Sequence, residues 1–142
     1  MTMRRRAREA AFGVLFQMDL GKLSLDEALA AARGQEWPPD DWTLVVALAR
    51  GTREHLAEID ALIASAAEHW TLERMATADR NILRMAIFEL KTARTPVGVV
   101  INEAVELAKR YSTEESGRFV NGLLGKLVRS GLPGLAQQAV DV

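Results

Sequence analysis

Cysteine is absent from this chain of 142 residues, which excludes disulfide bonds, thiolate nucleophiles and cysteine-based zinc sites. That absence fits a reducing compartment such as the cytoplasm. No apolar run approaches the roughly 20 residues that a membrane-spanning helix needs, so no membrane association is expected. The basic N-terminus continues into a charged, amphipathic stretch rather than an uninterrupted apolar segment, and it therefore makes a poor secretory signal.

Residues suited to catalysis are also scarce. The sequence contains no phosphate-binding GxxxxGK(S/T) loop, no GxSxG nucleophile elbow and no HExxH metal motif. Its two histidines, His55 and His69, are expected on one long helix about 20 Å apart, which is too far to share a metal ion. We therefore predict no catalytic residues, no metal, no cofactor and no enzyme activity. A hydrolase built on the carboxylates is the least favoured interpretation.

Helical periodicity runs along most of the chain. Apolar residues recur every three to four positions, and no segment alternates convincingly with a period of two. The sequence therefore predicts an all-α fold without a repeat of fixed length. The expected helices cover about residues 4–20, 24–34, 41–69, 78–92, 97–111 and 113–130.

Several helix boundaries carry local signals. Ser24 and Glu27 have the spacing of a capping box, in which each residue bonds the backbone N–H of the other. Gly51 lies inside the long third helix and predicts a bend or a close crossing of two helices. Gly131 and Pro133 end the last helix, and a frayed tail is expected after them.

Four residues depart from a simple amphipathic pattern. Phe12 and Phe16 lie off the main apolar stripe of the first helix, which predicts that this helix is buried on two sides. Asn102 and Asn121 interrupt apolar helical stretches. Hydrogen bonds between helices explain these two asparagines as well as a ligand does.

Positive charge is concentrated at the N-terminus. The net charge is −1, yet Arg4, Arg5, Arg6 and Arg8 crowd the start of the first helix. The rest of the chain contains 14 basic and 19 acidic residues. A cation at a helix N-terminus costs roughly 0.3–1 kcal/mol. We expect the four arginines to project from the end of the helix and to meet an anionic partner, the alternative being a solvated tail without function.

RNA is the anionic partner that this segment favours. Arginine binds phosphate with two parallel hydrogen bonds and stacks on bases, and arginine-rich segments commonly become ordered on RNA. Arg80, Arg84 and Lys91 share one side of a predicted helix and can extend the basic surface. Phe119, beside Arg118, can provide a platform on which a base stacks. Taken singly, each of these residues is also explained as an ordinary solvated charge or a core aromatic.

The strongest motifs are RRRARE at 4–9, DRNILRMAIFEL at 79–90, PV at 96–97, INEAVELAK at 101–109 and FVNGLL at 119–124. In order and spacing they resemble the family of the bacterial transcription antitermination factor NusB, across about residues 4–130. Residues 20–75 match that family only in helical layout.

The resemblance implies one RNA-binding domain over residues 1–142. Its fold would be about seven helices in two small three-helix bundles packed around a shared first helix. The N-terminal half would extend to about residue 75, the C-terminal half over 76–131 and a tail over 132–142.

The resemblance also implies an RNA-binding adaptor in transcription antitermination. With the ribosomal small-subunit protein NusE, such proteins hold the single-stranded boxA element of nascent ribosomal-type RNA and help RNA polymerase read through terminators. The expected location is the cytoplasm. A homodimer is compatible with the sequence, and so is masking of the arginines in such a dimer.

Family roles transfer to this sequence by motif. RNA contacts are implied for Arg4, Arg5, Arg6, Arg8, Arg84, Glu115 and Phe119, and contacts to NusE for Phe16, Leu20 and Asp79. Phe16 stands where a tyrosine is frequent and lacks its hydroxyl. Glu115 stands where an aspartate is frequent, which keeps the charge but changes its reach.

Two other interpretations stay open. A helical adaptor that binds only protein predicts that alanine at the four N-terminal arginines leaves partner binding intact and changes no RNA binding. The NusB-like domain of an RNA methyltransferase needs a following cofactor-binding domain with a GxGxG-type loop, and none precedes Val142. If about four phosphates are neutralised, RNA affinity should fall with salt at a logarithmic slope near −3.

Overall fold

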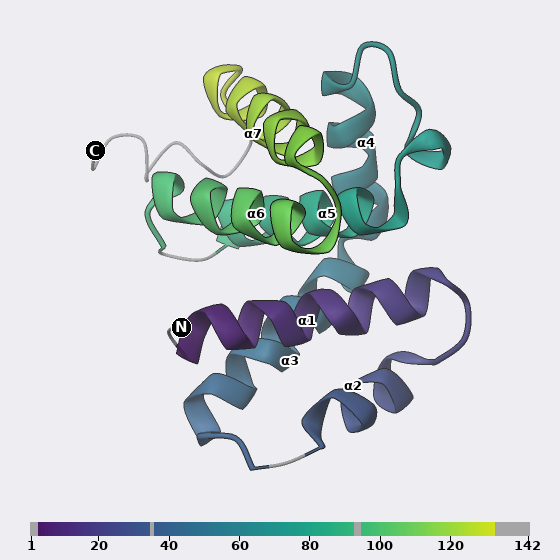
Figure 1. The fold of residues 1–142 in the computed structure, drawn as a ribbon, viewed down its shortest axis with the longest axis vertical. Helices are drawn as coiled ribbons and strands as arrows, with labels where there is room; N and C mark the ends of the chain where they lie inside the picture. Colours follow the sequence, from purple (N-terminus) through teal and green to yellow (C-terminus); the bar gives the residue numbers. More distant parts are fainter. Residues whose placement is uncertain (1–2, 35, 93–94, 133–142) are drawn as a thin grey trace.

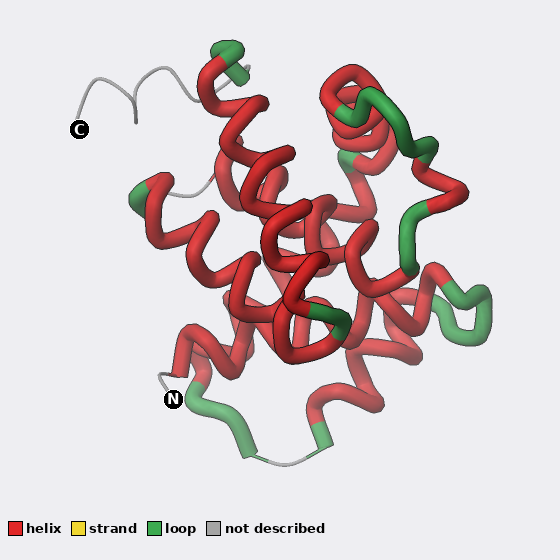
Figure 2. The backbone as a smooth tube through the Cα atoms, turned by 45° about the horizontal axis from the view of Figure 1, so that its top comes forward, coloured by secondary structure: helices red, strands yellow, loops and turns green. Residues whose placement is uncertain are grey.

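Seven α-helices and one short 3₁₀ helix form the described part of this computed structural model, which covers residues 3–34, 36–92 and 95–132. The helices are α1 (Met3–Asp19), α2 (Leu25–Arg33), α3 (Pro39–Glu54), α4 (Leu56–Ala66), η1 (Leu72–Arg74), α5 (Thr77–Thr92), α6 (Val97–Tyr111) and α7 (Glu114–Arg129). Figure 2 shows helices joined by loops and no strand in these residues, which confirms the all-α prediction. None of the described helices combines the length and the apolar character needed to cross a membrane.

Helix α5 lies at the centre of the molecule. It packs against α1, α3, α4, α6 and α7. Ile82, Leu83, Ile87 and Leu90 are fully buried, and polar residues between them are buried as well. A helix that is buried on all sides must satisfy its polar side chains internally, and this requirement determines much of the electrostatics described below.

The helices lie in two groups in Figure 1, with α1, α2 and α3 in the lower part and α4, α5, α6 and α7 in the upper part. Helix α1 packs against α2 and α3 on one side and against α5 on the other. Phe12 is 5% exposed and Phe16 is half-buried. The prediction that the first helix is covered on two sides is confirmed.

Two helix ends that the sequence predicted from local signals are present in the structure. Ser24 accepts a hydrogen bond from the Glu27 backbone N–H while Glu27 accepts one from the Ser24 backbone N–H, so the capping box is present. Gly131 follows α7 with φ +75°, a conformation that glycine adopts without strain. Pro133 and the predicted frayed tail lie outside the described residues.

The prediction of one long helix over 41–69 is wrong. The chain turns at His55, where φ is −109° and ψ is 20°, and α3 and α4 are separate helices. The physical reason is packing, because α3 covers α1 while α4 covers α5 and α7. His69 lies beyond the end of α4, so the two histidines do not share a helix. The close crossing expected at Gly51 is confirmed, since a Cβ there would collide with the Phe88 ring of α5.

Candidate nucleic-acid interface

The arginines at the start of α1 are held in different ways. Arg4 is exposed and forms no hydrogen bond or ion pair with the rest of the described chain. The Arg6 guanidinium carbon lies 3.9 Å from the centre of the Trp37 ring, a cation–π contact that leaves the side chain partly exposed. Both side chains therefore remain near the surface with donors that an anion can reach.

Arg5 is bound by a carboxylate of α6 yet stays accessible. Its Nε donates to Glu103 Oε1 at 3.0 Å and its Nη2 donates to Glu103 Oε2 at 2.6 Å. The hydrogen bonds and charge of Arg5 hold the pKa of Glu103 below its usual value, although burial opposes this. The Arg5 side chain is 39% exposed, so its outer face is available to a second anion.

Arg8 does not project from the helix as predicted. It is 5% exposed, and its Nε and Nη2 donate to the two carboxylate oxygens of Glu89 in α5 at 3.0 and 2.5 Å. The hydrogen bonds that Arg8 donates to Glu89 raise the pKa of the guanidinium against the opposing effect of burial. This partner could not be predicted from the sequence, because Glu89 lies 81 positions away.

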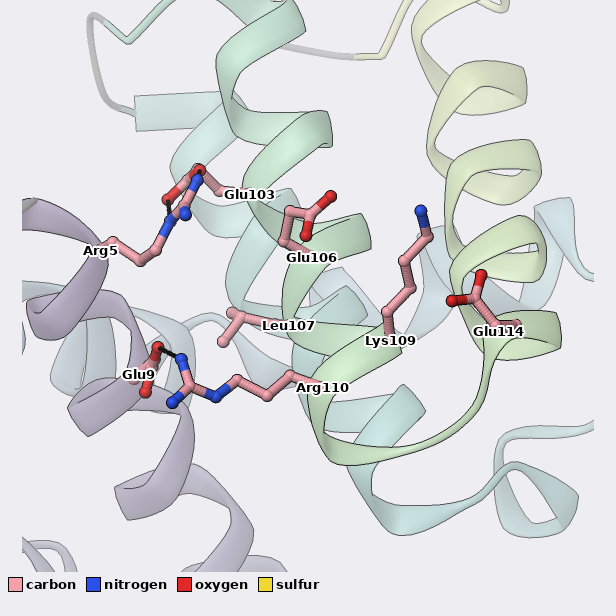
Figure 3. Close-up of a pocket in the computed structure, with 8 residues that line it drawn as sticks. All are labelled: Arg5, Glu9, Glu103, Glu106, Leu107, Lys109, Arg110 and Glu114. Carbon is pink, nitrogen blue, oxygen red and sulfur yellow. Dashed lines mark hydrogen bonds and ion pairs between the residues drawn. The ribbon is translucent and has the colours of Figure 1, made fainter. Parts of the chain in front are cut away.

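A cleft between α1 and α6 lies next to the arginines (Figure 3). Its volume is about 410 Å³, and its lining residues are Arg5, Glu9, Glu103, Glu106, Leu107, Lys109, Arg110 and Glu114. Within it, Glu9 accepts hydrogen bonds from Arg110 Nη1 and from the Tyr111 hydroxyl, both at 2.8 Å. Its four carboxylates outnumber its three cations, so the cleft itself is not an anion site.

The basic residues predicted to form a second surface on α5 do not form a solvent-exposed face. Arg84 is 8% exposed and donates to both oxygens of Asp60 at 2.8 and 2.9 Å and to Asp19 Oδ2 at 3.2 Å. Arg80 donates to the same Asp19 oxygen at 2.8 Å. Lys91 is paired with a carboxylate of α4. These cations serve the packing of α5 against α1 and α4, and the expectation of an exposed basic stripe is wrong.

Asp19 is the acceptor at the centre of this cluster. Burial alone would raise its pKa, but hydrogen bonds from Arg80 and Asn81 and the charge of Arg84 lower the pKa below its ordinary value. Sequence reasoning did not identify Asp19 or Asp60. Their signal was weak, because each carboxylate lies on a different helix from the arginines that it binds.

A third region brings together residues for which different roles were expected. A pocket of about 290 Å³ between the start of α7 and the segment before α5 is lined by Trp70, Arg74, Met75, Asp79, Thr113, Glu115, Ser116 and Phe119. Glu115 and Phe119 were expected to contact RNA, and Asp79 was expected to contact the protein partner. The structure places all three in one pocket.

Two features of this pocket suit a ligand. Trp70 is 54% exposed and Phe119 is half-buried, so two aromatic rings are accessible. Asp79 is 8% exposed, and its Oδ2 accepts from the Ser116 hydroxyl at 2.9 Å while its Oδ1 has no partner within the described chain. Trp70 was not predicted as a functional residue from the sequence.

The remaining predicted partner residues lie along α1. Phe16 is half-buried, with its ring centre 5.9 Å from that of Phe12. Leu20, directly after the helix, is 45% exposed. The ion pair between Asp19 and Arg80 ties this end of α1 to the first turns of α5, the helix that carries Asp79.

The chemistry of these regions is that of binding. Among the described residues, no three His, Cys, Asp or Glu side chains come together in a way that could hold a metal ion. His55 is exposed, and its Nδ1 lies 2.8 Å from the Gly51 carbonyl oxygen of its own helix. The arrangement offers guanidinium donors and two accessible aromatic rings.

Comparisons with known proteins agree with this description. The model of the NusB family matches residues 5–129. The transcription antitermination protein NusB of Solibacter usitatus is 47% identical over 133 residues, which cover 91% of this chain and 90% of that protein. The solved structure of T. maritima NusB superposes with a TM-score of 0.90 at 37% identity and covers 99% of both chains. A chain of the crystal structure of antitermination factors NusB and NusE in complex with dsRNA superposes with a TM-score of 0.82 at 29% identity, covering 92% of this chain and 98% of that one.

Proposed function

We propose, from the premise that this chain belongs to the NusB family, that it is an RNA-binding antitermination factor which works together with a NusE protein. The NusB family consists of RNA-binding transcription factors and not of enzymes. The finer proposal is that the chain and NusE together hold the single-stranded boxA element of nascent ribosomal-type RNA. The bound complex would help RNA polymerase read through terminators, and its place of action would be the cytoplasm.

The observation that carries the proposal is the position of Arg4, Arg5 and Arg6. These residues crowd the positive end of the α1 dipole, where cations are unfavourable, and all three keep an accessible face. An RNA backbone would supply the negative charge that this end of the helix lacks. For Arg8 and Arg84 we propose a supporting role, because carboxylates from other helices already bind both guanidinium groups.

The pocket that contains Phe119 and Trp70 supports single-stranded RNA as the ligand. A base can stack on an exposed ring only when it is free of its own pairing partner. Stacking of this kind contributes about 1–3 kcal/mol per base. Glu115 lies at the same pocket and would favour the amino groups of a base over a phosphate.

NusE would approach along Phe16, Leu20 and Asp79. The exposed Leu20 and half-buried Phe16 offer apolar contact, and Asp79 lines the pocket at the start of α7. Asp79 shares its pocket with Phe119, so the RNA and the protein partner would meet there. Binding of the two ligands should therefore be cooperative.

Titration of a labelled single-stranded boxA-like RNA tests this function. We expect weak binding by the protein alone and about tenfold tighter binding when NusE is present, a coupling within the usual range for two linked ligands. A hairpin in which the same sequence is paired should bind more weakly, because its bases cannot stack on Phe119. Equal affinity with and without NusE would contradict a shared site.

A further inference from the structure

A groove between α6 and α7 takes no part in the function proposed above. Its volume is about 510 Å³, and it is lined by Gly98, Ile101, Asn102, Val105, Lys109, Gly117, Arg118 and Asn121. The two helices pack closely at one end, where a Cβ on Gly117 would lie 2.9 Å from Lys109 Cγ. Most of these residues belong to the INEAVELAK and FVNGLL motifs, and the RNA site proposed above uses none of these groove residues.

The side chains of Asn102 and Asn121 line this groove. Both are exposed, and neither forms a hydrogen bond with the rest of the described chain. Of the two explanations that the sequence left open for them, the hydrogen bonds between helices are not formed. Each carboxamide presents one acceptor and two donors to the groove, the complement of the N–H and C=O groups of a peptide backbone.

The groove has the length of a short extended segment. Residues 98, 102, 105 and 109 share one face of α6, and a rise of 1.5 Å per residue separates the first from the last by about 16 Å. An extended peptide advances about 3.3 Å per residue, so about five residues would fill the groove. Gly98 presents no side chain at its open end, which lets a second backbone approach.

The groove is positively charged. Lys109 and Arg118 line it and form no ion pair in the described structure, and no carboxylate is among the lining residues. The neighbouring acids Glu106 and Glu114 line the adjacent cleft toward α1, which shares Lys109 with the groove. Ile101 and Val105 are half-buried and form an apolar floor.

We propose that this groove binds an extended, acidic peptide segment of a partner protein, with Asn102 and Asn121 bonding its backbone. Alternate side chains of an extended peptide point to opposite sides, so apolar residues would face Ile101 and Val105 while acidic residues approach Lys109 and Arg118. No aromatic side chain is among the lining residues of the groove. This favours peptide over RNA, because sites for single-stranded nucleic acid combine a basic groove with aromatic platforms. Phe119 lines two other pockets and not this groove.

A labelled peptide of alternating glutamate and valine is the probe for this proposal. Added to the full-length protein, it should cause saturable NMR shifts at the amides of Gly98, Asn102 and Asn121. The double variant Asn102→Ala with Asn121→Ala should bind about fivefold or more weakly, and so should Lys109→Gln with Arg118→Gln, because each removes two contacts at the rim. A peptide of alternating lysine and valine should bind at least about tenfold more weakly than the acidic one.

Matched changes elsewhere control for general effects of charge and polarity. Gln17→Ala on α1 and Arg53→Gln on α3 should leave the affinity for the acidic peptide unchanged. Three results would overturn the proposal: no saturable shift in the groove, shifts caused there by oligouridine and not by the peptide, or shifts that follow dilution of the protein alone. The second result would assign the groove to RNA and the third to another copy of the chain.

Discussion

At the scale of single residues, arginine has two separate roles in this protein. Arg8 and Arg84 are less than a tenth exposed and bind carboxylates from other helices, whereas Arg4 is exposed. A buried ion pair gives little net stability compared with apolar residues of the same volume, but removal of one member leaves an uncompensated charge in the core. Arg8 and Arg84 therefore fix the position of α1 against α5, whereas Arg4 remains accessible to a ligand.

Replacement of Glu89 by glutamine tests the role of the buried ion pair between Arg8 and Glu89. Glu89 and Arg8 side chains are 3% and 6% exposed, so the variant should lose about 3–5 kcal/mol of unfolding free energy. Urea denaturation measures this loss. Glu68→Gln, which removes a carboxylate from a largely exposed pair with Lys126, is the control and should change stability little. Equal effects of the two changes would show that the Arg8–Glu89 pair has no special structural role.

Glu103 predicts a dependence of stability on pH. Its pKa is lowered in the folded protein from an ordinary value of 4.5, chiefly by the hydrogen bonds from Arg5. A carboxylate with a lowered folded pKa contributes stability above its unfolded pKa and loses it as pH falls through the folded pKa. Unfolding free energy should therefore drop below about pH 4.5 more steeply in the native protein than in Glu103→Gln. Parallel pH profiles for the two proteins would contradict this assignment.

At the scale of helices, the sequence predicted best where the signal was local. The capping box at Ser24 and the stop at Gly131 depend on residues within a few positions of each other, and both were predicted. The break at His55 was not, because the apolar pattern continues across it and only packing against different partners separates α3 from α4. The inward turn of Arg84 was missed for the same reason, since its acceptors Asp19 and Asp60 lie on other helices.

The crossing of α3 and α5 provides a test at this scale. Gly51→Ala would place a methyl group within the Phe88 ring, so that ring must move out of its packed position. Overpacking of this kind costs about 1–3 kcal/mol. Gly13→Ala is the matched control, because its Cβ meets no atom within 4 Å and alanine favours a helix by about 0.5–1 kcal/mol. Thermal unfolding should show a lower Tm for the first variant and a higher Tm for the second.

At the scale of the whole molecule, three surfaces surround one central helix. The arginines at the start of α1, the aromatic pocket at the start of α7 and the groove between α6 and α7 are all positioned by elements that pack directly or indirectly on α5. Motifs in the sequence indicated each of these regions. They did not indicate which residues share a pocket. Asp79 and Phe119 lie 40 positions apart, and their meeting depends on the packing of α5 against α7.

The salt dependence of RNA binding is the sharpest test of the arginines at the start of α1. With Arg8 held by Glu89, three arginines remain for phosphates, so the logarithm of affinity for single-stranded boxA RNA should fall with the logarithm of salt at a slope of about −2. The double variant Arg4→Gln with Arg6→Gln keeps the Arg5–Glu103 pair and should reduce the slope to about −1. Lys22→Gln with Arg53→Gln makes the same change in net charge elsewhere and should leave the slope at its native value. A slope near zero for the native protein, or equal slopes for the native protein and the Arg4/Arg6 variant, would contradict the assignment of these arginines to RNA.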